Sequence, residues 1–375
     1  MRPAQARPLR VLMTADTVGG VWTYAIDLAR ALRQERVEVA LATLGRPCST
    51  QQRRDAQDVA SLGLFESSFR LPWMNQPWDD VRETRSWLKE LSWYLEPDVL
   101  HLNDPVHASG DYNAPTVAVG HSCVLSWWEA VQKSPAPASW NRYRREMVRG
   151  FASADAVVSP SQWMLQALKR YYGVQGGRVI PNGRYSTDLC PGTKEEFIFA
   201  AGRVWDPAKN LMALDEPAEE LAWPIYVAGE QHHPEGQSSA SASRIRMLGC
   251  LPATEVAEWL GRASIYAFPA RYEPFGLSVL EAALSGCALV LSDIPTLREL
   301  WDGKAIFVGV DDRAALRLAV EALIEDPHLR QTLAMRARHH ALTLTPRRMA
   351  LGYSAVYSEL LTRSSAMPEE QACAS

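Results

Sequence analysis

Short apolar runs alternate with longer amphipathic stretches along the 375-residue chain. This alternation is typical of parallel strands joined by crossover helices, because a strand covered on both faces reads as a continuous apolar run. In the first half, strands are expected at 9–15, 37–43, 98–103, 116–122 and 155–161. The helical period at 21–33 and 139–153 predicts helices there.

The alternation stops at 184–196, a stretch of turn-forming residues that we interpret as an interdomain linker. It then resumes, with strands expected at 197–203, 223–230, 264–270, 287–293 and 304–309, helices from 312 onward, and a polar surface loop at 231–244. The pattern predicts an α/β protein of two doubly wound domains. The expected boundaries are 1–185 and 190–345, with the helix at 346–363 long enough to carry 346–375 back onto the first domain.

Composition places the chain among globular proteins, with 47% hydrophobic and 22% charged residues. The net charge of −4 gives no basic field that would favour a nucleic-acid partner. The cysteines are scattered and form no C-x-x-C pair, which is typical of reduced thiols in a cytosolic protein. The first residues contain too short an apolar run for a secretion signal, so the expected location is cytoplasmic.

The first candidate for chemistry is the stretch "TADTVGGVWTYAIDLA", in which Gly19 and Gly20 stand between an expected strand and an expected helix. This arrangement presents backbone N–H groups to a phosphate or sugar oxygen. The alternative is a tight turn that needs positive φ. The full G-x-G-x-x-G motif is absent, which disfavours an NAD-dependent oxidoreductase.

The second candidate is "AAGRVWDPAKN", with Arg203 just after an expected strand and Lys209 beyond a proline-containing loop. Ligands of open α/β sheets bind at the carboxyl ends of the strands. A guanidinium fork and an ammonium group suit a diphosphate. Each cation alone would be an ordinary solvated charge.

The third candidate is "RYEPFGLSVLEAALSG", in which Glu273 and Glu281 flank the start of an expected helix. Gly276 allows close approach of the backbone, and the N–H groups of Leu277 and Ser278 lie in the first turn. Carboxylates bind sugar hydroxyls, whereas cations and N–H groups bind phosphates. Together these groups fit a ligand with hydroxyls at both ends and a diphosphate between them.

These motifs resemble the retaining glycosyltransferases of the GT-B fold, in particular the family 4 group (glycosyl transferases group 1). The resemblance rests on "AGRVWDPAKN", "PNG" at 181–183, the stretch 248–293 with its glutamate pair, and "TVGG" and "GHS" in the first half. It implies two Rossmann-like domains facing across a cleft, the first binding the acceptor and the second the nucleotide-sugar donor.

The resemblance also implies residue roles. The diphosphate would be bound by Arg203 and Lys209, the ribose by Glu281 and the transferred sugar by Glu273. Backbone groups of Phe275, Gly276, Leu277 and Ser278 would line the donor, Gly19 and Gly20 would close on it, and His121 would be an active-site histidine. The catalytic set is then His121, Arg203, Lys209 and Glu273. For His121, a buried histidine satisfied by the backbone is the alternative.

The implied reaction moves a hexosyl group from a nucleoside-diphosphate sugar to a hydroxyl of a glycan, lipid or small molecule. Retention implies that the acceptor attacks from the face that the nucleotide leaves. The sequence contains no D-x-D, so we expect no metal and no cofactor besides the donor substrate.

Rival interpretations stay open at this point. A GT-B phosphorylase or a sugar-nucleotide epimerase would share the fold, and an inactive carbohydrate-binding scaffold would share it without turnover. The segment "SWNRYRREMVR" places Arg142, Arg145 and Arg149 at helical spacing. It is either a solvated helix face or a peripheral contact with anionic lipids at the inner face of a membrane.

Overall fold

The computed structural model describes residues 7–232 and 244–365. These residues form two compact units. The first unit comprises residues 7–125, 136–183 and 346–365 of the described chain, and the second unit comprises 126–135 and 184–345, with 233–243 undescribed. Both units are α/β with parallel sheets, so the predicted fold class is confirmed.

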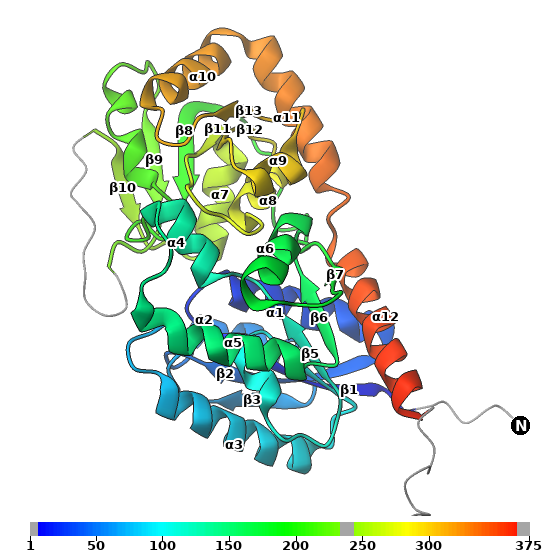
Figure 1. Ribbon diagram of the computed structural model, residues 1–375. Helices are drawn as coiled ribbons and strands as arrows, with labels where there is room; N and C mark the ends of the chain where they lie inside the picture. Colours follow the sequence, from blue (N-terminus) through cyan, green and yellow to red (C-terminus); the bar gives the residue numbers. More distant parts are fainter. Residues whose placement is uncertain (1–6, 233–243, 366–375) are drawn as a thin grey trace, which may run out of the picture. The chain divides into compact units, whose positions relative to one another are not determined.

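The first unit contains a parallel sheet in the order β3-β2-β1-β4-β5-β6-β7 (Figure 1). Its strands are β1 (Leu9–Asp16), β2 (Val37–Leu44), β3 (Gly63–Glu66), β4 (Val99–Leu102), β5 (Thr116–Val119), β6 (Ala156–Ser159) and β7 (Arg178–Val179). Strands β4 and β5 are entirely buried and β1 is buried from Val11 to Ala15, as expected of apolar runs covered on both faces.

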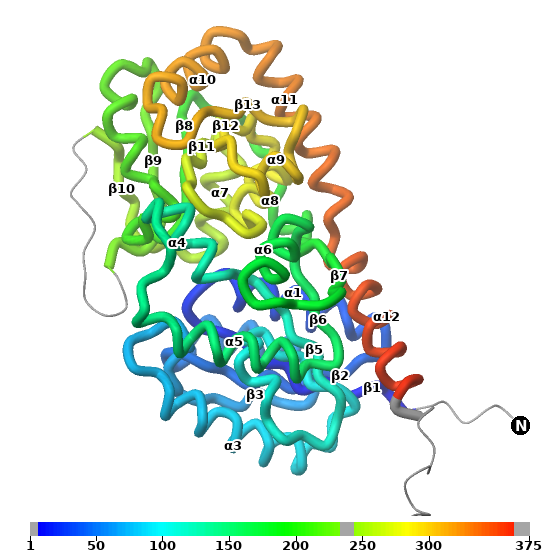
Figure 2. The backbone as a smooth tube through the Cα atoms, viewed as in Figure 1, coloured from blue at the N-terminus to red at the C-terminus, as the bar shows by residue number. Residues whose placement is uncertain are grey.

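Helices cover the faces of this sheet. They are α1 (Gly20–Leu32), α2 (Thr50–Gln57), α3 (Trp78–Leu95), α5 (Asn141–Ser153), α6 (Gln162–Tyr172) and α12 (Pro346–Ser365). Most of α4 (Val124–Gln132) belongs to the second unit. The Ser161 side chain caps α6, and Gly173 ends it in the left-handed conformation. Helix α12 packs against α1 (Figure 2), so the expected return of the C-terminal helix to the first unit is confirmed.

The second unit contains a parallel sheet in the order β10-β9-β8-β11-β12-β13. Its strands are β8 (Glu195–Ala201), β9 (Ile225–Ala228), β10 (Arg246–Gly249), β11 (Ala263–Phe268), β12 (Ala288–Ser292) and β13 (Ile306–Val308). Its further helices are α7 (Ala253–Arg262), α8 (Leu277–Leu284), α9 (Pro295–Trp301), α10 (Arg313–Glu325) and α11 (Pro327–Ala341). Asp312 and Asp326 cap α10 and α11 through their side chains.

The sequence pattern missed β3, β7 and β10. All are short edge strands with partly exposed residues, so they lack the apolar run by which the central strands were recognised. The stretch 231–244, expected to be a surface loop, lies mostly outside the described residues.

Strand order fixes where each unit can bind a ligand. In the first unit the order reverses between β1 and β4, and in the second between β8 and β11. Open α/β sheets bind ligands beyond the carboxyl ends of the strands at such reversals. The segments to inspect are therefore those that follow Asp16 and Leu102 in the first unit, and Ala201 and Phe268 in the second.

Candidate functional site

Beyond β8 and β9 the two backbones almost touch. Gly229 has φ of 145°, and a Cβ at this position would lie 1.7 Å from the carbonyl oxygen of Gly202. The Gly202 N–H donates to the Ala228 carbonyl at 3.0 Å, which continues the pairing past the end of β8. Only glycine fits at 229, and this contact fixes where the chain leaves the sheet toward Arg203.

Arg203 heads a tight loop that Asp206 organises. Its Nη2 donates to the Asp206 carboxylate at 2.7 Å, and its guanidinium lies over the Trp205 ring, 5.2 Å from the centroid. The other Asp206 oxygen accepts the Ala208 N–H at 2.9 Å. The Arg203 side chain is 37% exposed, so it is oriented by the loop and still accessible to an anion.

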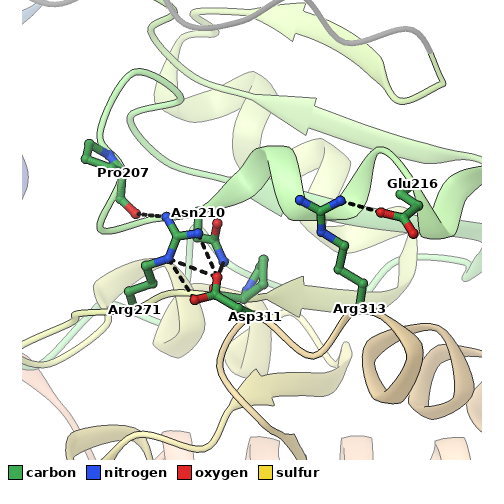
Figure 3. A network of polar contacts seen from close by, with 7 residues as sticks. Pro207, Asn210, Glu216, Arg271, Asp311 and Arg313 are labelled. Carbon is green, nitrogen blue, oxygen red and sulfur yellow. Dashed lines mark hydrogen bonds and ion pairs between the residues drawn. The ribbon is translucent and has the colours of Figure 1, made fainter. Parts of the chain in front are cut away.

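A polar network joins this loop to the segment that follows β11 (Figure 3). Arg271 donates to Asp311 at 2.6 Å and to the Pro207 carbonyl at 3.2 Å. Asn210 donates to Asp311 at 3.2 Å and to the Pro269 carbonyl at 3.0 Å. Two loops far apart in sequence are thus tied together, and this brings Lys209 next to Glu273.

The contact between Lys209 and Glu273 is the centre of the site in the second unit. The Lys209 ammonium donates to Glu273 Oε2 at 2.6 Å, and the side chains are only 14% and 12% exposed. Glu273 Oε1 accepts the N–H groups of Phe275 at 3.2 Å and Gly276 at 2.9 Å. The carboxylate therefore also shapes the loop that leads into α8.

Helix α8 begins with Gly276 as its N-cap, at φ 91° in the left-handed region. Its first main-chain bond runs from the Leu280 N–H to the Gly276 carbonyl at 3.0 Å. The N–H groups of Leu277 and Ser278 belong to the turn that an α-helix cannot satisfy internally, so they can meet an anion. Phe275 is buried, whereas Leu277 and Ser278 are partly exposed.

Glu281 lies one turn further along α8 and is paired with Arg184. The Arg184 Nε and a Glu281 oxygen are 2.9 Å apart, and their side chains are 16% and 17% exposed. The sequence analysis assigned Arg184 only to an interdomain linker. Tyr266, on β11, donates to the Ala201 carbonyl at 3.2 Å, and burial raises the pKa of its phenol.

In the first unit, Gly19 is the N-cap of α1 and Gly20 its first residue, and both are exposed. Gly19 has φ of 172°, an extended conformation open to any residue, so the alternative of a turn needing positive φ is wrong. Nearby, the Asp16 carboxylate accepts the Val18 N–H at 2.5 Å. The glycines leave the start of α1 free of side chains.

His121 follows β5 and is partly exposed. Its Nε2 lies 2.8 Å from Asn103 Oδ1, and its ring contacts the Tyr24 ring edge-on with centroids 4.5 Å apart. Burial lowers the pKa of His121 to about 3, so the imidazole is neutral near pH 7. Its hydrogen-bond partner is a side chain, so the alternative of a histidine satisfied by the backbone does not describe this contact.

Sequence reasoning overlooked several residues of the site. Asp206 and Arg184 give little signal because single charges in loops are common. Ser126 was not considered either; residues 126–135 belong to the second unit, where the Ser126 hydroxyl donates to the Tyr272 hydroxyl at 3.1 Å. Tyr272 precedes Glu273, so this segment packs beside the glutamate loop.

Two family models match the chain. Residues 18–184 match the model of Glycosyltransferase Family 4, and residues 195–326 match the model of Glycosyl transferases group 1. The second match contains the loop of Arg203 and Lys209 and both glutamates. The first contains the start of α1 and His121.

The chain is 26% identical over 347 residues to the phosphatidyl-myo-inositol mannosyltransferase of Mycolicibacterium smegmatis, covering 86% of this chain and 85% of that one. Its fold matches sucrose-phosphate synthase from Thermosynechococcus elongatus with a TM-score of 0.77, at 16% identity over 95% of this chain and 100% of that one. It also matches Anabaena HepE in complex with UDP-glucose with a TM-score of 0.74, at 16% identity over 94% of this chain and 100% of that one. The chain is a glycosyltransferase of the family 4 type with the GT-B fold.

Proposed function

We propose that the chain transfers a sugar from a nucleoside-diphosphate sugar to a hydroxyl acceptor, with retention of configuration and without a metal. The observation that carries the proposal is the contact of Lys209 with Glu273 at 2.6 Å, held in a largely buried position beside the N-terminus of α8. This places a cation for phosphate and a carboxylate for sugar hydroxyls at one point. The UDP-glucose bound to HepE is the kind of donor that such a point fits.

The leaving group is a nucleoside diphosphate, and its negative charge grows as the sugar–phosphate bond breaks. Lys209, Arg203 and the first N–H groups of α8 are oriented before the ligand arrives, since Asp206 and Glu273 hold the two loops. Preorganised groups of this kind contribute about 3–4 kcal/mol each to transition-state stabilisation. They take the part that a divalent cation has in D-x-D enzymes.

Retention follows from attack on the face that the diphosphate leaves. The departing phosphate oxygen then accepts the proton of the acceptor hydroxyl. In this proposal Glu281 binds the ribose, Glu273 binds hydroxyls of the transferred sugar, and the neutral His121 contacts that sugar. Gly19 and Gly20 give the donor access to the N-terminus of α1.

Thermal unfolding with uridine, guanosine and adenosine diphosphates tests the donor site. We expect one of them to raise Tm, because a ligand that binds only the folded protein increases the free energy of unfolding by RT ln(1 + [L]/Kd). The matched control is Arg313→Ala, which removes an exposed cation of the same unit that pairs with Glu216. The proposal fails if no nucleotide stabilises the protein, or if Lys209→Ala and Arg313→Ala respond to the nucleotide alike.

Turnover tests the metal-free chemistry separately. With a donor found in this way, excess chelator should leave transfer unchanged, and the anomeric configuration of the product should match that of the donor. Activity lost to chelator and restored by magnesium or manganese would overturn the metal-free mechanism. Inverted product would overturn retention.

We propose that the acceptor is a hydroxyl compound. The name of the mycobacterial relative favours a lipid. Within the residues that the structure describes, no helix is long and apolar enough to cross a membrane. On α5, Arg144 and Arg145 are exposed, as are Arg142 and Arg149. We propose that this face meets anionic headgroups.

Co-sedimentation with phosphatidylcholine vesicles, with and without phosphatidylserine, tests the membrane contact. We expect binding only to the anionic vesicles, and Arg144→Glu combined with Arg145→Glu should abolish it. The control is Arg262→Glu on α7 of the second unit, which removes an exposed arginine that pairs with Glu195. Equal binding to both kinds of vesicle, or no binding, would contradict the contact.

A further inference from the structure

A chain of polar side chains runs through the interior of the first unit and connects α12 to His121. His101, on β4, is fully buried. Its Nδ1 lies 2.7 Å from the Tyr357 hydroxyl of α12, and its Nε2 lies 3.1 Å from the Tyr24 hydroxyl and 3.2 Å from Asn103 Oδ1. The same Asn103 oxygen contacts His121 Nε2 at 2.8 Å.

The orientation of the Asn103 amide follows from its other contacts. Its backbone N–H donates to the Thr14 hydroxyl at 2.8 Å, and its side-chain NH2 donates to the Thr14 carbonyl at 2.6 Å. A carbonyl can only accept, so the NH2 group must face Thr14. Oδ1 therefore faces the two imidazoles, and because it too can only accept, both must donate to it.

The positions of the ring protons follow in turn. The Nε2 atoms of His101 and His121 both carry hydrogen. A neutral imidazole has one N–H, so each ring has its lone pair on Nδ1. In this tautomer His101 Nδ1 accepts the hydroxyl hydrogen of Tyr357, so Tyr357 and Asn103 stabilise the same proton position from the two sides of the ring.

Burial supports the neutral state of both rings. It lowers the pKa of His101 and of His121 to about 3, and the nearby His121 lowers that of His101 further. Burial also raises the pKa of Tyr357, so its hydroxyl remains a donor. The chain therefore carries no net charge near pH 7.

We propose that Tyr357 and His101 are positioning residues that fix His121 as its neutral Nε2–H tautomer, with the Nδ1 lone pair ready to accept a hydrogen bond from a sugar hydroxyl. The sugar as ligand rests on the proposed function, but the tautomer does not. In this arrangement α12 contributes to the active site through Tyr357, besides packing against α1.

Removal of the Tyr357 hydroxyl is expected to weaken the preference of His101 for one tautomer, and through Asn103 to affect His121. Without the Tyr357 hydroxyl, the Nδ1 lone pair of His101 loses its donor. The proton can then move to Nδ1, because the Tyr24 hydroxyl, 3.1 Å from Nε2, can donate to the bare nitrogen. Nε2 would then face the Asn103 oxygen as acceptor against acceptor. Relief of this clash requires Asn103 to shift, and its contact with His121 changes with it. For metal-bound histidines, loss of the outer partner that fixes the tautomer costs about 10–100-fold in metal affinity or activity, and we expect an effect at the lower end of that range here.

The test is histidine 15N NMR of the full chain, in which two-bond 1H–15N couplings distinguish the tautomers. The signals of His121 are those that disappear in His121→Ala. We expect His121 to be an Nε2–H tautomer in the wild type and a tautomer mixture in Tyr357→Phe. With a donor and acceptor in hand, Tyr357→Phe should lower kcat about tenfold with little change in KM for the donor.

The matched control is Tyr112→Phe, which removes another tyrosine hydroxyl of the same unit that donates to a backbone carbonyl at 2.8 Å. It should change neither the spectrum of His121 nor kcat. An Nδ1–H or doubly protonated His121 in the wild type overturns the proposal without any variant, as does a Tyr357→Phe protein with unchanged spectrum and kcat. The expected tautomer in a protein without transferase activity would refute the proposed function and leave this inference standing.

Discussion

The polar clusters at the sheet reversals of the two units differ in charge. In the second unit the cluster is ionic, with Lys209 on Glu273 at 2.6 Å and Arg203 on Asp206 at 2.7 Å. In the first unit it is a set of neutral rings and amides around Asn103. Even the carboxyl group beside it tends to neutrality, because burial and the neighbouring Asp16 raise the pKa of Asp104 to about 7.

This difference matches the parts of a nucleotide-sugar. Partly buried ions need compensation when no ligand is present, and the internal pairs of the second unit supply it. A sugar is uncharged, and a neutral imidazole can meet it with a lone pair at no cost of burying a charge. The ionic cluster of the second unit therefore suits the charged part of the proposed donor, and the neutral cluster of the first unit suits an uncharged hydroxyl ligand.

The largest effect should come from removing the cation of the ionic cluster. Lys209→Ala should lower kcat by about 10²–10³, because in the proposed function Lys209 is a preorganised group that stabilises the leaving diphosphate. Steady-state kinetics and circular dichroism of the purified variant measure this. An unfolded variant would show that Lys209 mainly compensates Glu273, and full activity would show that the pair has no part in the reaction.

The next effect separates the two glutamates. Glu281 is proposed to bind the ribose, which the nucleotide product retains, whereas Glu273 is proposed to bind the sugar that leaves. Glu281→Ala should weaken nucleoside diphosphate binding by about 1.5–3 kcal/mol, the range for hydrogen bonds to charged groups. Glu273→Gln, which keeps an acceptor for the Gly276 N–H, should depress transfer and leave this affinity near wild type.

Calorimetric titration of both variants with the nucleotide decides between these roles. Arg184→Ala is the informative control, since it frees Glu281 from its partner at 2.9 Å without removing the carboxylate. Equal losses in the Glu281 and Glu273 variants would mean that the pair merely holds α8 and its loop in shape.

The apolar periodicity of the sequence predicted the central strands from which both clusters extend. The buried strands β1, β4, β8 and β11 are recognisable because parallel central strands are apolar on both faces. Their carboxyl ends and the loops at Arg203 and Glu273 follow from strand order. The structure brings the candidate residues Lys209 and Glu273 into contact at 2.6 Å, whereas their roles toward a donor stay a prediction.

The partners of these residues could not be predicted, because they depend on loop geometry. Arg184 reaches Glu281 from a stretch without periodicity, and Asp206 orients Arg203 through a local turn. In the first unit, His101 lies inside an expected strand, where a single polar residue in an apolar run gives no signal of a specific role. Its role depends on Tyr357, which is distant in sequence and reaches it only through the packing of α12.

A smaller effect is expected at the glycine between the glutamates. Gly276 has φ of 91°, and a Cβ there would be 3.3 Å from a Val279 methyl group and 3.5 Å from Glu273 Cγ. The space nearly suffices, so the cost of Gly276→Ala is mainly backbone strain of about 1–2 kcal/mol. Urea unfolding gives this value, and nucleotide titration should show weaker binding as the N-terminus of α8 shifts. An unchanged free energy of unfolding would show that the loop relaxes into another conformation.

The last prediction uses acid to probe the neutral interior of the first unit. Burial lowers the pKa of His107 to about 3, with nearby Arg85 lowering it further, and the ring is 1% exposed. Between about pH 6.5 and 3 the unfolded state binds a proton on this ring and the folded state does not, so its stabilising contribution is complete above about pH 6.5 and is lost as the pH falls.

Within the described residues neither ring nitrogen of His107 has a hydrogen-bond partner, so His107→Leu breaks no such bond. The variant should reduce the slope of unfolding free energy against pH by about 1.4 kcal/mol per unit in this window. Urea unfolding of both proteins at about pH 6, 5 and 4 measures the slopes, and equal slopes would show that His107 takes up its proton in the folded state and that the interior of the first unit tolerates charge after all.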